Sequence, residues 1–224
     1  MSTHRLRLFS ILCLLPLILV AGCFDLEMEL SLKKDGSGVF SSALIAPKQL
    51  ASGKLNLARP LVVQPPPENS LQTRGDQVAY ISKASFQSLS SLVTRPGVEL
   101  ELRQVDSGFL WGLFAPTYRL RAQIEGIAQA EAKQAAPVFI GHFFKAVLEV
   151  PGEIKTAHAA SLEGLSIQPE ISDNKRQVKW LVPLDSFLSH QGPLVFAVDF
   201  KADLDLPPDQ RKSVKSRVET DRDE

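Results

Sequence analysis

The fold is decided by an unbroken alternation of apolar and polar side chains over residues 24–32, Phe24-Asp25-Leu26-Glu27-Met28-Glu29-Leu30-Ser31-Leu32. Successive side chains of a strand point to opposite faces, so the pattern predicts a strand with one face in a core and one in water. Residues 33–38 follow and predict a tight reversal, in which Gly36 or Gly38 takes positive φ. Residues 39–45 then resume extended character. Together the two stretches predict a β-hairpin.

Similar patterns along the rest of the chain set the predicted fold class. Further strands are predicted over residues 77–86, 98–105, 117–124, 145–150, 178–182 and 195–200. Short helices, or a turn in the second case, are predicted over 47–57, 87–93 and 126–136. We therefore expect an α+β fold, a single domain with a mostly antiparallel β-sheet and two or three short helices.

Three polar segments show neither the alternation of a strand nor the apolar spacing of a helix. Residues 60–75 contain Pro65-Pro66-Pro67 and predict a surface loop or a polyproline segment. Residues 161–177 are loop-like. The last segment, 207–224, begins with Pro207-Pro208 and is charged, with few large apolar residues, so it is predicted to be a disordered tail.

The first 22 residues have the layout of a secretory signal. Arg5 and Arg7 precede an apolar run over 8–20, and the small residues Ala21 and Gly22 follow it. The run is shorter than the roughly 20 apolar residues of a spanning helix. We expect residues 1–22 to be a cleaved signal peptide and 23–206 to form the domain. The alternative is a permanent N-terminal anchor helix.

The segment Leu19-Val20-Ala21-Gly22-Cys23 resembles the lipobox of bacterial lipoproteins. In that family a diacylglyceryl group is attached to the cysteine sulfur and the chain is cut before that residue. The resemblance implies that Cys23 is the lipid attachment site, palmitate being a typical acyl group, and that the protein lies in the cell envelope on the extracytoplasmic side. Phe24, rather than an aspartate, follows Cys23. This favours an outer-membrane protein facing the periplasm where the organism has two membranes.

Composition restricts the chemistry that the chain can perform. The 25 basic and 25 acidic residues form no basic field for nucleic acid. Cys13 lies in the signal, so the mature chain keeps Cys23 alone, which excludes disulfides and cysteine-ligated metal. The histidines of the mature chain do not have the spacing of metal ligands. The chain also lacks the nucleophile elbow of a hydrolase. We expect a protein that is not an enzyme, with no cofactor, no metal and no nucleic-acid partner.

One stretch is apolar on both faces, Phe109-Leu110-Trp111-Gly112-Leu113-Phe114. Two explanations are open for it. The first is a strand covered on both sides. The second is an apolar rim that contacts an amphiphile, formed by Phe109, Trp111 and Phe114. Trp180, which alternates with Val178 and Val182, is expected to lie in the core.

Several segments resemble the bacterial domain family named after the mycobacterial lipoprotein LppM. They are residues 145–154, which close in Pro151-Gly152-Glu153-Ile154, then 157–159, 178–180 and 195–200. The opening hairpin resembles that family as well. The resemblance implies an envelope domain linked with lipid or glycolipid binding and brings no catalytic residues. The alternatives are an assembly protein that contacts another envelope protein by its sheet edge or apolar patch, and, more remotely, a hydrolase without a recognisable motif.

Overall fold

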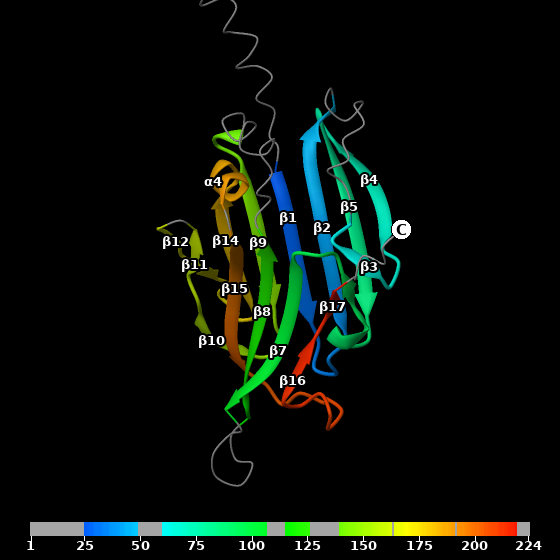
Figure 1. The fold of residues 1–224 in the computed structure, drawn as a ribbon, viewed down its shortest axis with the longest axis vertical. Coiled ribbons are helices and arrows are strands. Elements are labelled where there is room, and N and C mark those ends of the chain that lie inside the picture. The colour runs from blue at the N-terminus through cyan, green and yellow to red at the C-terminus, as the bar shows by residue number, and fades with distance from the viewer. Residues whose placement is uncertain are drawn as a thin grey trace, which may run out of the picture.

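The structure, a computed structural model, describes residues 25–48, 60–106, 115–125, 139–162, 164–190 and 192–218. Two sheets face each other in it as the layers of a sandwich (Figure 1). The first sheet has seven strands, in the order β13 (Glu170–Ile171), β14 (Gln177–Pro183), β9 (Phe143–Glu149), β1 (Asp25–Leu32), β2 (Gly38–Pro47), β5 (Gln77–Phe86) and β4 (Glu68–Arg74). The second has five, in the order β10 (Glu153–Ala157), β15 (Pro193–Lys201), β8 (Thr117–Glu125), β7 (Val98–Asp106) and β16 (Ser213–Lys215).

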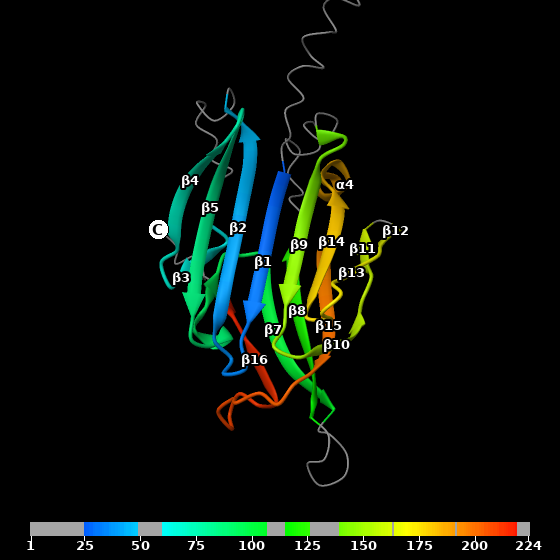
Figure 2. The same ribbon diagram turned by 180° about the vertical axis from the view of Figure 1, so that it is seen from behind.

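Smaller elements close the sides of the sandwich. A two-stranded sheet pairs β11 (Ala160–Leu162) with β12 (Leu165–Ile167). A three-stranded sheet has the order β17 (Arg217–Val218), β6 (Val93–Thr94) and β3 (Val62–Gln64). The 3-10 helix η2 covers Leu89–Ser91, and the α-helix α4 covers Leu184–Ser189. Figure 2 shows the seven-stranded sheet from its outer side, with β1 in its middle.

The strand β1 occupies the middle of its sheet because it pairs on both sides. It runs antiparallel to β2, with Leu30 opposite Phe40, and parallel to β9, with Leu30 opposite Leu148. Its even-numbered residues face the second sheet, and Met28 and Leu30 are fully buried. The alternation of residues 24–32 therefore builds the centre of the core, as the sequence predicts.

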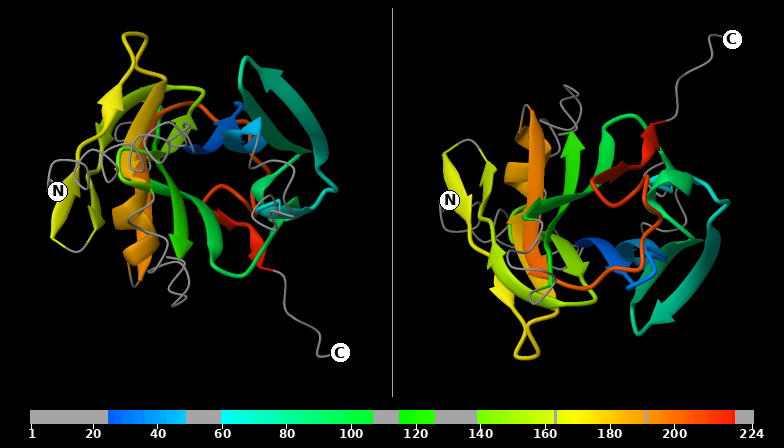
Figure 3. Two further views of the ribbon diagram at one scale, coloured as in Figure 1. Left: turned by 90° about the horizontal axis from the view of Figure 1, so that it is seen from above. Right: turned by 90° about the horizontal axis from the view of Figure 1, so that it is seen from below.

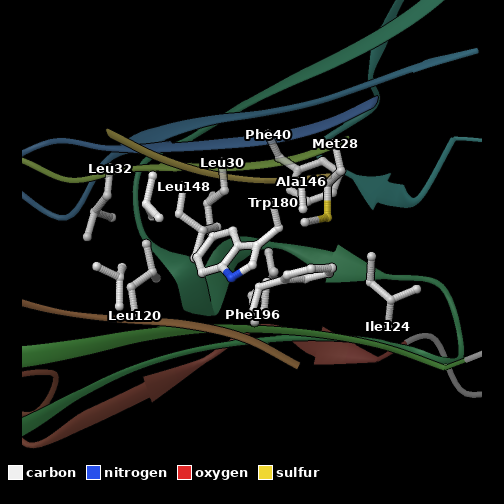
Figure 4. Packing of buried hydrophobic residues seen from close by; sticks show 14 of the residues in the cluster. Met28, Leu30, Leu32, Phe40, Leu120, Ile124, Ala146, Leu148, Trp180 and Phe196 are labelled. Atoms are coloured by element: carbon white, nitrogen blue, oxygen red, sulfur yellow. The ribbon is translucent and has the colours of Figure 1, made fainter. Parts of the chain in front are cut away.

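The core lies between the two sheets and is centred on Trp180 (Figure 4). The Trp180 ring is fully buried and packs against Phe196 of the opposite sheet, with ring centroids 5.3 Å apart. Its indole Nε1–H donates to the carbonyl oxygen of His158 at 3.0 Å. The prediction of a core tryptophan is confirmed. Within the described residues, the buried cluster begins at Met28 and ends at Val214.

The reversal between β1 and β2 uses Gly36, which has φ +78. The Gly36 N–H donates to the Lys33 carbonyl at 3.1 Å. The hydroxyl and the backbone N–H of Ser37 donate to Asp35 Oδ1 at 2.6 and 3.0 Å, and these bonds hold the pKa of Asp35 below its usual value. The predicted hairpin and its positive-φ glycine are confirmed.

The predicted α+β class is wrong. The described residues are mostly β, and their helices are α4 and the single 3-10 turn η2. The helix or turn predicted over 87–93 is η2 followed by β6, since a connection this short has room for one turn only. The other two predicted helices, 47–57 and 126–136, fall almost wholly outside the described residues. In the described part of the chain, no helix is long and apolar enough to cross a membrane.

Several segments predicted to lack regular structure pair by their backbones. Residues 68–74 form the edge strand β4. The run of prolines ends at residue 67, so every residue of β4 keeps a backbone N–H that can bond to β5. The loop-like segment 161–177 contains β12 and β13. The tail predicted to be disordered adds β16 and β17 as far as residue 218, and Ser216 inside it is buried. Its last residues, 219–224, lie outside the described part.

Candidate functional site

A cavity of about 630 Å³ lies between the sheets. This volume falls in the range of about 300–1,000 Å³ that is usual for small-molecule sites. The lining is predominantly apolar and comes from both sheets, from α4 and from the residues before β7: Leu26, Leu44, Leu61, Leu71, Tyr80, Pro96, Val98, Ile124, Phe144, Phe187 and Leu188, with Glu27, Ser42, Ala43, Asn69, Ser70, Ile81, Ser82, Gly97 and Glu125.

The cavity lies toward the end of the molecule where β1 begins. Leu26 is the second residue of β1, Val98 is the first of β7, and Phe144 is the second of β9. Glu125 is the last residue of β8. In Figure 1, β1 and β9 begin near α4 in the upper part of the view, while β7 begins and β8 ends about halfway down. Figure 3 shows the two layers from this end and from the opposite one.

Burial along single strands marks where the sheets separate. On the core side of β1, Met28 and Leu30 are fully buried while Leu26 is half-buried. On the core side of β5, Ala84 is buried while Ser82 and Tyr80 are half-buried. All three of these half-buried residues line the cavity. Positions that the alternation assigns to the core therefore face unfilled space at this end.

On the core face of the first sheet, the strand register arranges the lining in two rows. An apolar row runs across four strands through the paired residues Leu26, Leu44, Tyr80 and Leu71. The next row inward carries Ser42, Ser82 and Asn69, again as cross-strand partners. Uncharged hydroxyl and amide groups thus lie beside a wide apolar surface. This combination suits a ligand with an apolar body and a polar, uncharged group.

Aromatic rings close one side of the cavity. Phe144 of β9 stacks on Phe187 of α4, with centroids 4.9 Å apart and an interplanar angle of 24°. Helix α4 follows β14 directly, and its Leu184 N–H donates to the carbonyl of His142 at 2.8 Å. That bond fixes the helix against the turn that precedes β9. The aromatic wall is therefore held by both of its elements.

A second hollow lies on the outer face of the five-stranded sheet. It measures about 390 Å³ and is lined by charged residues over a floor of small apolar ones: Glu101, Arg103, Arg119, Arg121, His158, Val195 and Ala197. Arg119 donates to both carboxylate oxygens of Asp199, at 2.6 and 2.7 Å, and His158 Nε2 lies 3.1 Å from Asp199 Oδ2. Among these lining residues there is no hydroxyl or thiol nucleophile. The cluster reads as an ion-pair network that joins β8, β15 and the turn after β10.

Asp199 makes this network sensitive to pH. Burial raises its pKa, but the hydrogen bonds from Arg119 and His158 outweigh that effect and hold the pKa below the usual value. A carboxylate with a lowered pKa stabilises the fold above its unfolded pKa of about 3.9, and that contribution is lost as the pH falls through the folded value.

We expect Asp199→Asn to reduce the free energy of unfolding at pH 7 by about 1–3 kcal/mol, because it removes a charge-assisted pair of hydrogen bonds that is partly screened by solvent. Urea unfolding of variant and wild type should be compared at pH 7, 5 and 3. The difference should persist at pH 5 and shrink at pH 3. A difference that stays constant down to pH 3 would contradict this role.

The residues predicted from sequence as sites all lie outside the described part of the chain. Cys23, Phe109, Trp111 and Phe114 are all outside the described residues. Asp106 and Thr117, which flank the segment with the three aromatic residues, lie at the end of the molecule opposite Asp25 (Figure 1). The cavity thus uses a set of residues that sequence reasoning missed. Its sequence signals are Ser42 and Ser82, polar residues at core-facing positions of β2 and β5.

Among solved structures, the chain is similar to the NMR structure of the folded domain of the LppM protein from Mycobacterium tuberculosis. The TM-score is 0.43 and the sequence identity 9%, and the alignment covers 84% of this chain and 94% of that chain. LppM is the protein after which the family resembled by the sequence is named. No protein-family model and no curated protein matches the chain.

Proposed function

We propose that this chain is a bacterial envelope lipoprotein that binds the apolar part of an amphiphile, a lipid or glycolipid, without catalysis. Cys23 carries its lipid anchor on the extracytoplasmic side of a membrane, the outer membrane where two are present. The observation that supports binding is the cavity, in which core-facing positions of β1, β2, β4 and β5 surround space instead of packing together. Apolar cavities of this size are favourable environments for hydrocarbon because the ligand leaves water on entry.

The lining also limits the chemical class of ligand. Leu26, Leu44 and Tyr80 offer contact to an acyl chain or a comparable hydrocarbon. Ser42, Ser82 and Asn69 offer hydrogen bonds to hydroxyl, ester or amide groups. A ligand with an apolar chain joined to an uncharged polar group fits both rows of the lining.

The cavity is tested by filling it. Ser82→Phe places a ring on the core face of β5, and we expect it to weaken binding of a fluorescent fatty alcohol, an uncharged amphiphile, to the unlipidated domain, residues 25–224, at least tenfold. The matched control is Ser85→Phe, an exposed residue on the outer face of the same strand. It should bind as wild type does. Binding is followed by fluorescence titration, with circular dichroism to show that both variants are folded. Equal affinity of folded Ser82→Phe and wild type would remove the cavity as the site.

The anchor is tested separately by intact-mass analysis of the protein from cells. We expect a chain that begins at Cys23 and carries acyl groups, and a longer unprocessed chain for Cys23→Ala. An unmodified Cys23 still joined to Gly22 would end the lipoprotein assignment.

A second candidate is an accessory role in assembly. Strand β4 is an edge of the seven-stranded sheet, and its Leu71 is 62% exposed. Exposed edge strands can pair with a strand of another protein. Native mass spectrometry of the domain isolated from cells distinguishes the two candidates. A co-purified lipid supports binding, and a stoichiometric protein supports assembly.

A further inference from the structure

Three exposed apolar side chains gather where β9 begins. Ile140 is 70% exposed, Phe143 41% and Leu181 39%. Phe143 pairs with Pro183 and Lys145 pairs with Leu181, so Phe143 and Leu181 are diagonal neighbours on the outer face of the first sheet. Ile140 lies in the turn that immediately precedes β9, which the His142 N–H closes by donating to the Phe139 carbonyl at 3.1 Å. We call Ile140, Phe143 and Leu181 the apolar tip.

The apolar tip contacts the start of the folded chain. The backbone N–H of Phe143 donates to Asp25 Oδ1 at 3.1 Å, and Leu26 pairs with Phe144 in the parallel ladder. Cys23 is two residues before Asp25. Two residues span at most about 7 Å, because each fully extended residue covers about 3.3–3.6 Å. A lipid on Cys23 therefore brings the apolar tip to the membrane surface with almost no slack.

The charged groups that adjoin the apolar tip, Lys145, Glu27 and Asp25, carry no net positive charge that would attract anionic lipid. Lys145 forms an ion pair with Glu27 at 3.2 Å, and the Asp25 carboxylate accepts the Phe143 N–H. Burying a branched and an aromatic side chain in the headgroup and acyl boundary is favourable in proportion to the apolar area removed from water. Contact here should depend little on anionic lipid.

We infer that the apolar tip enters the interfacial layer of the membrane that holds the Cys23 anchor, and that it orients the domain with its cavity end toward the bilayer. The anchor part of this inference rests on the proposed function. The apolar tip and the cavity meet at consecutive residues of β9, because Phe143 lies on the outer face of the sheet and Phe144 lines the cavity. An amphiphile leaving the bilayer beside the tip therefore has a short path to the cavity.

Nitroxide labels test the orientation. The acylated Cys23 leaves the mature chain without a free thiol, so Ile140→Cys and Phe143→Cys each provide one labelling site in the full-length processed lipoprotein. The matched control is Val105→Cys, 46% exposed near the end of β7 that lies opposite the tip (Figure 1). The proteins are placed in vesicles of phosphatidylethanolamine and phosphatidylglycerol. Relaxation by oxygen, which enters membranes, is compared with relaxation by a water-soluble nickel chelate.

At positions 140 and 143 we expect the ratio of oxygen to nickel relaxation to be at least twice that at position 105. Equal ratios at all three positions would overturn the inference. Substitution at the 70% exposed Ile140 leaves the core intact, so the result does not depend on Phe143 alone. The inference would also be overturned if the label at position 105 lay in lipid while the labels at 140 and 143 lay in water. The same holds if, in detergent, a bound protein rather than lipid shields the labels at 140 and 143 from the nickel chelate.

Failure of this inference can be separated from failure of the proposed function. The intact mass of each labelled sample reports acylation of Cys23, and titration of residues 25–224 with the fluorescent fatty alcohol reports the cavity. Acylated protein that binds the fatty alcohol but shows water at 140 and 143 would overturn the orientation alone. An Ile140→Ser/Phe143→Ser variant should bind the fatty alcohol from solution as wild type does, and take it from vesicles at least threefold more slowly.

Discussion

Trp180→Ala is expected to lower the free energy of unfolding by about 3–5 kcal/mol, the usual cost of truncating a fully buried aromatic residue. The ring is completely buried between the sheets and packs on Phe196. Its loss leaves a cavity at the centre of the core. The carbonyl of His158 also loses the hydrogen bond from the indole. Urea unfolding followed by far-UV circular dichroism measures the change.

Two variants in the same strand separate the contributions. Trp180→Phe keeps a ring but removes the indole N–H, and should cost about 1–3 kcal/mol for the unsatisfied carbonyl and the lost volume. Leu181→Ala changes a neighbour that is 39% exposed, and should cost under about 1 kcal/mol. A Trp180→Ala variant as stable as Leu181→Ala would contradict the description of the core.

Gly38→Val should lower the free energy of unfolding by about 3 kcal/mol or more, because the added side-chain atoms would overlap neighbouring atoms that cannot move away. A Cβ at Gly38 would collide with the backbone oxygen of Ser31, and it would lie 2.5 Å from Cζ of Phe86. Overpacking in a well-filled site costs about 1–3 kcal/mol, and more where backbone must shift. Thermal and urea unfolding of the domain measure the loss.

Gly36→Val and Gly75→Val provide the comparison. Both glycines have positive φ, with +78 and +63. At Gly75 nothing lies near the added Cβ, so this variant reports backbone strain alone, about 1–3 kcal/mol. At Gly36 the Cβ would meet the flexible side chain of Leu206, which adds a smaller cost. If Gly38→Val cost no more than Gly75→Val, close packing of the first hairpin would not explain the need for glycine.

The strands could be predicted from the sequence because their signal is local. Strand β8 alternates along its whole length and the structure buries every second residue of it from Tyr118 to Ile124. The tail strand β16 was missed because its signal is one apolar residue, Val214, between polar neighbours in a charged segment. Its stability comes from pairing with β7, more than a hundred residues earlier, which composition cannot report.

The cavity was not predictable for a related reason. Alternation says which face of a strand points inward, but not how far away the opposite sheet lies. Leu26 and Met28 follow the same pattern, yet Met28 is packed and Leu26 borders open space. Ser42 and Ser82 were the available signal, since each places a hydroxyl on a core-facing position and the register brings the two together. In the sequence they are forty residues apart.

The central place of β1 has a mechanical consequence. A pull on the chain ahead of Asp25 acts along the strand, and β1 is held on one side by the ladder to β2, from Asp25 to Leu32, and on the other by the ladder to β9. Ladder hydrogen bonds lie across the strand direction, so such a load shears both rows together instead of opening them one bond at a time. The fold thus resists a pull on the N-terminal end of β1 with two ladders, where an edge strand would have only one.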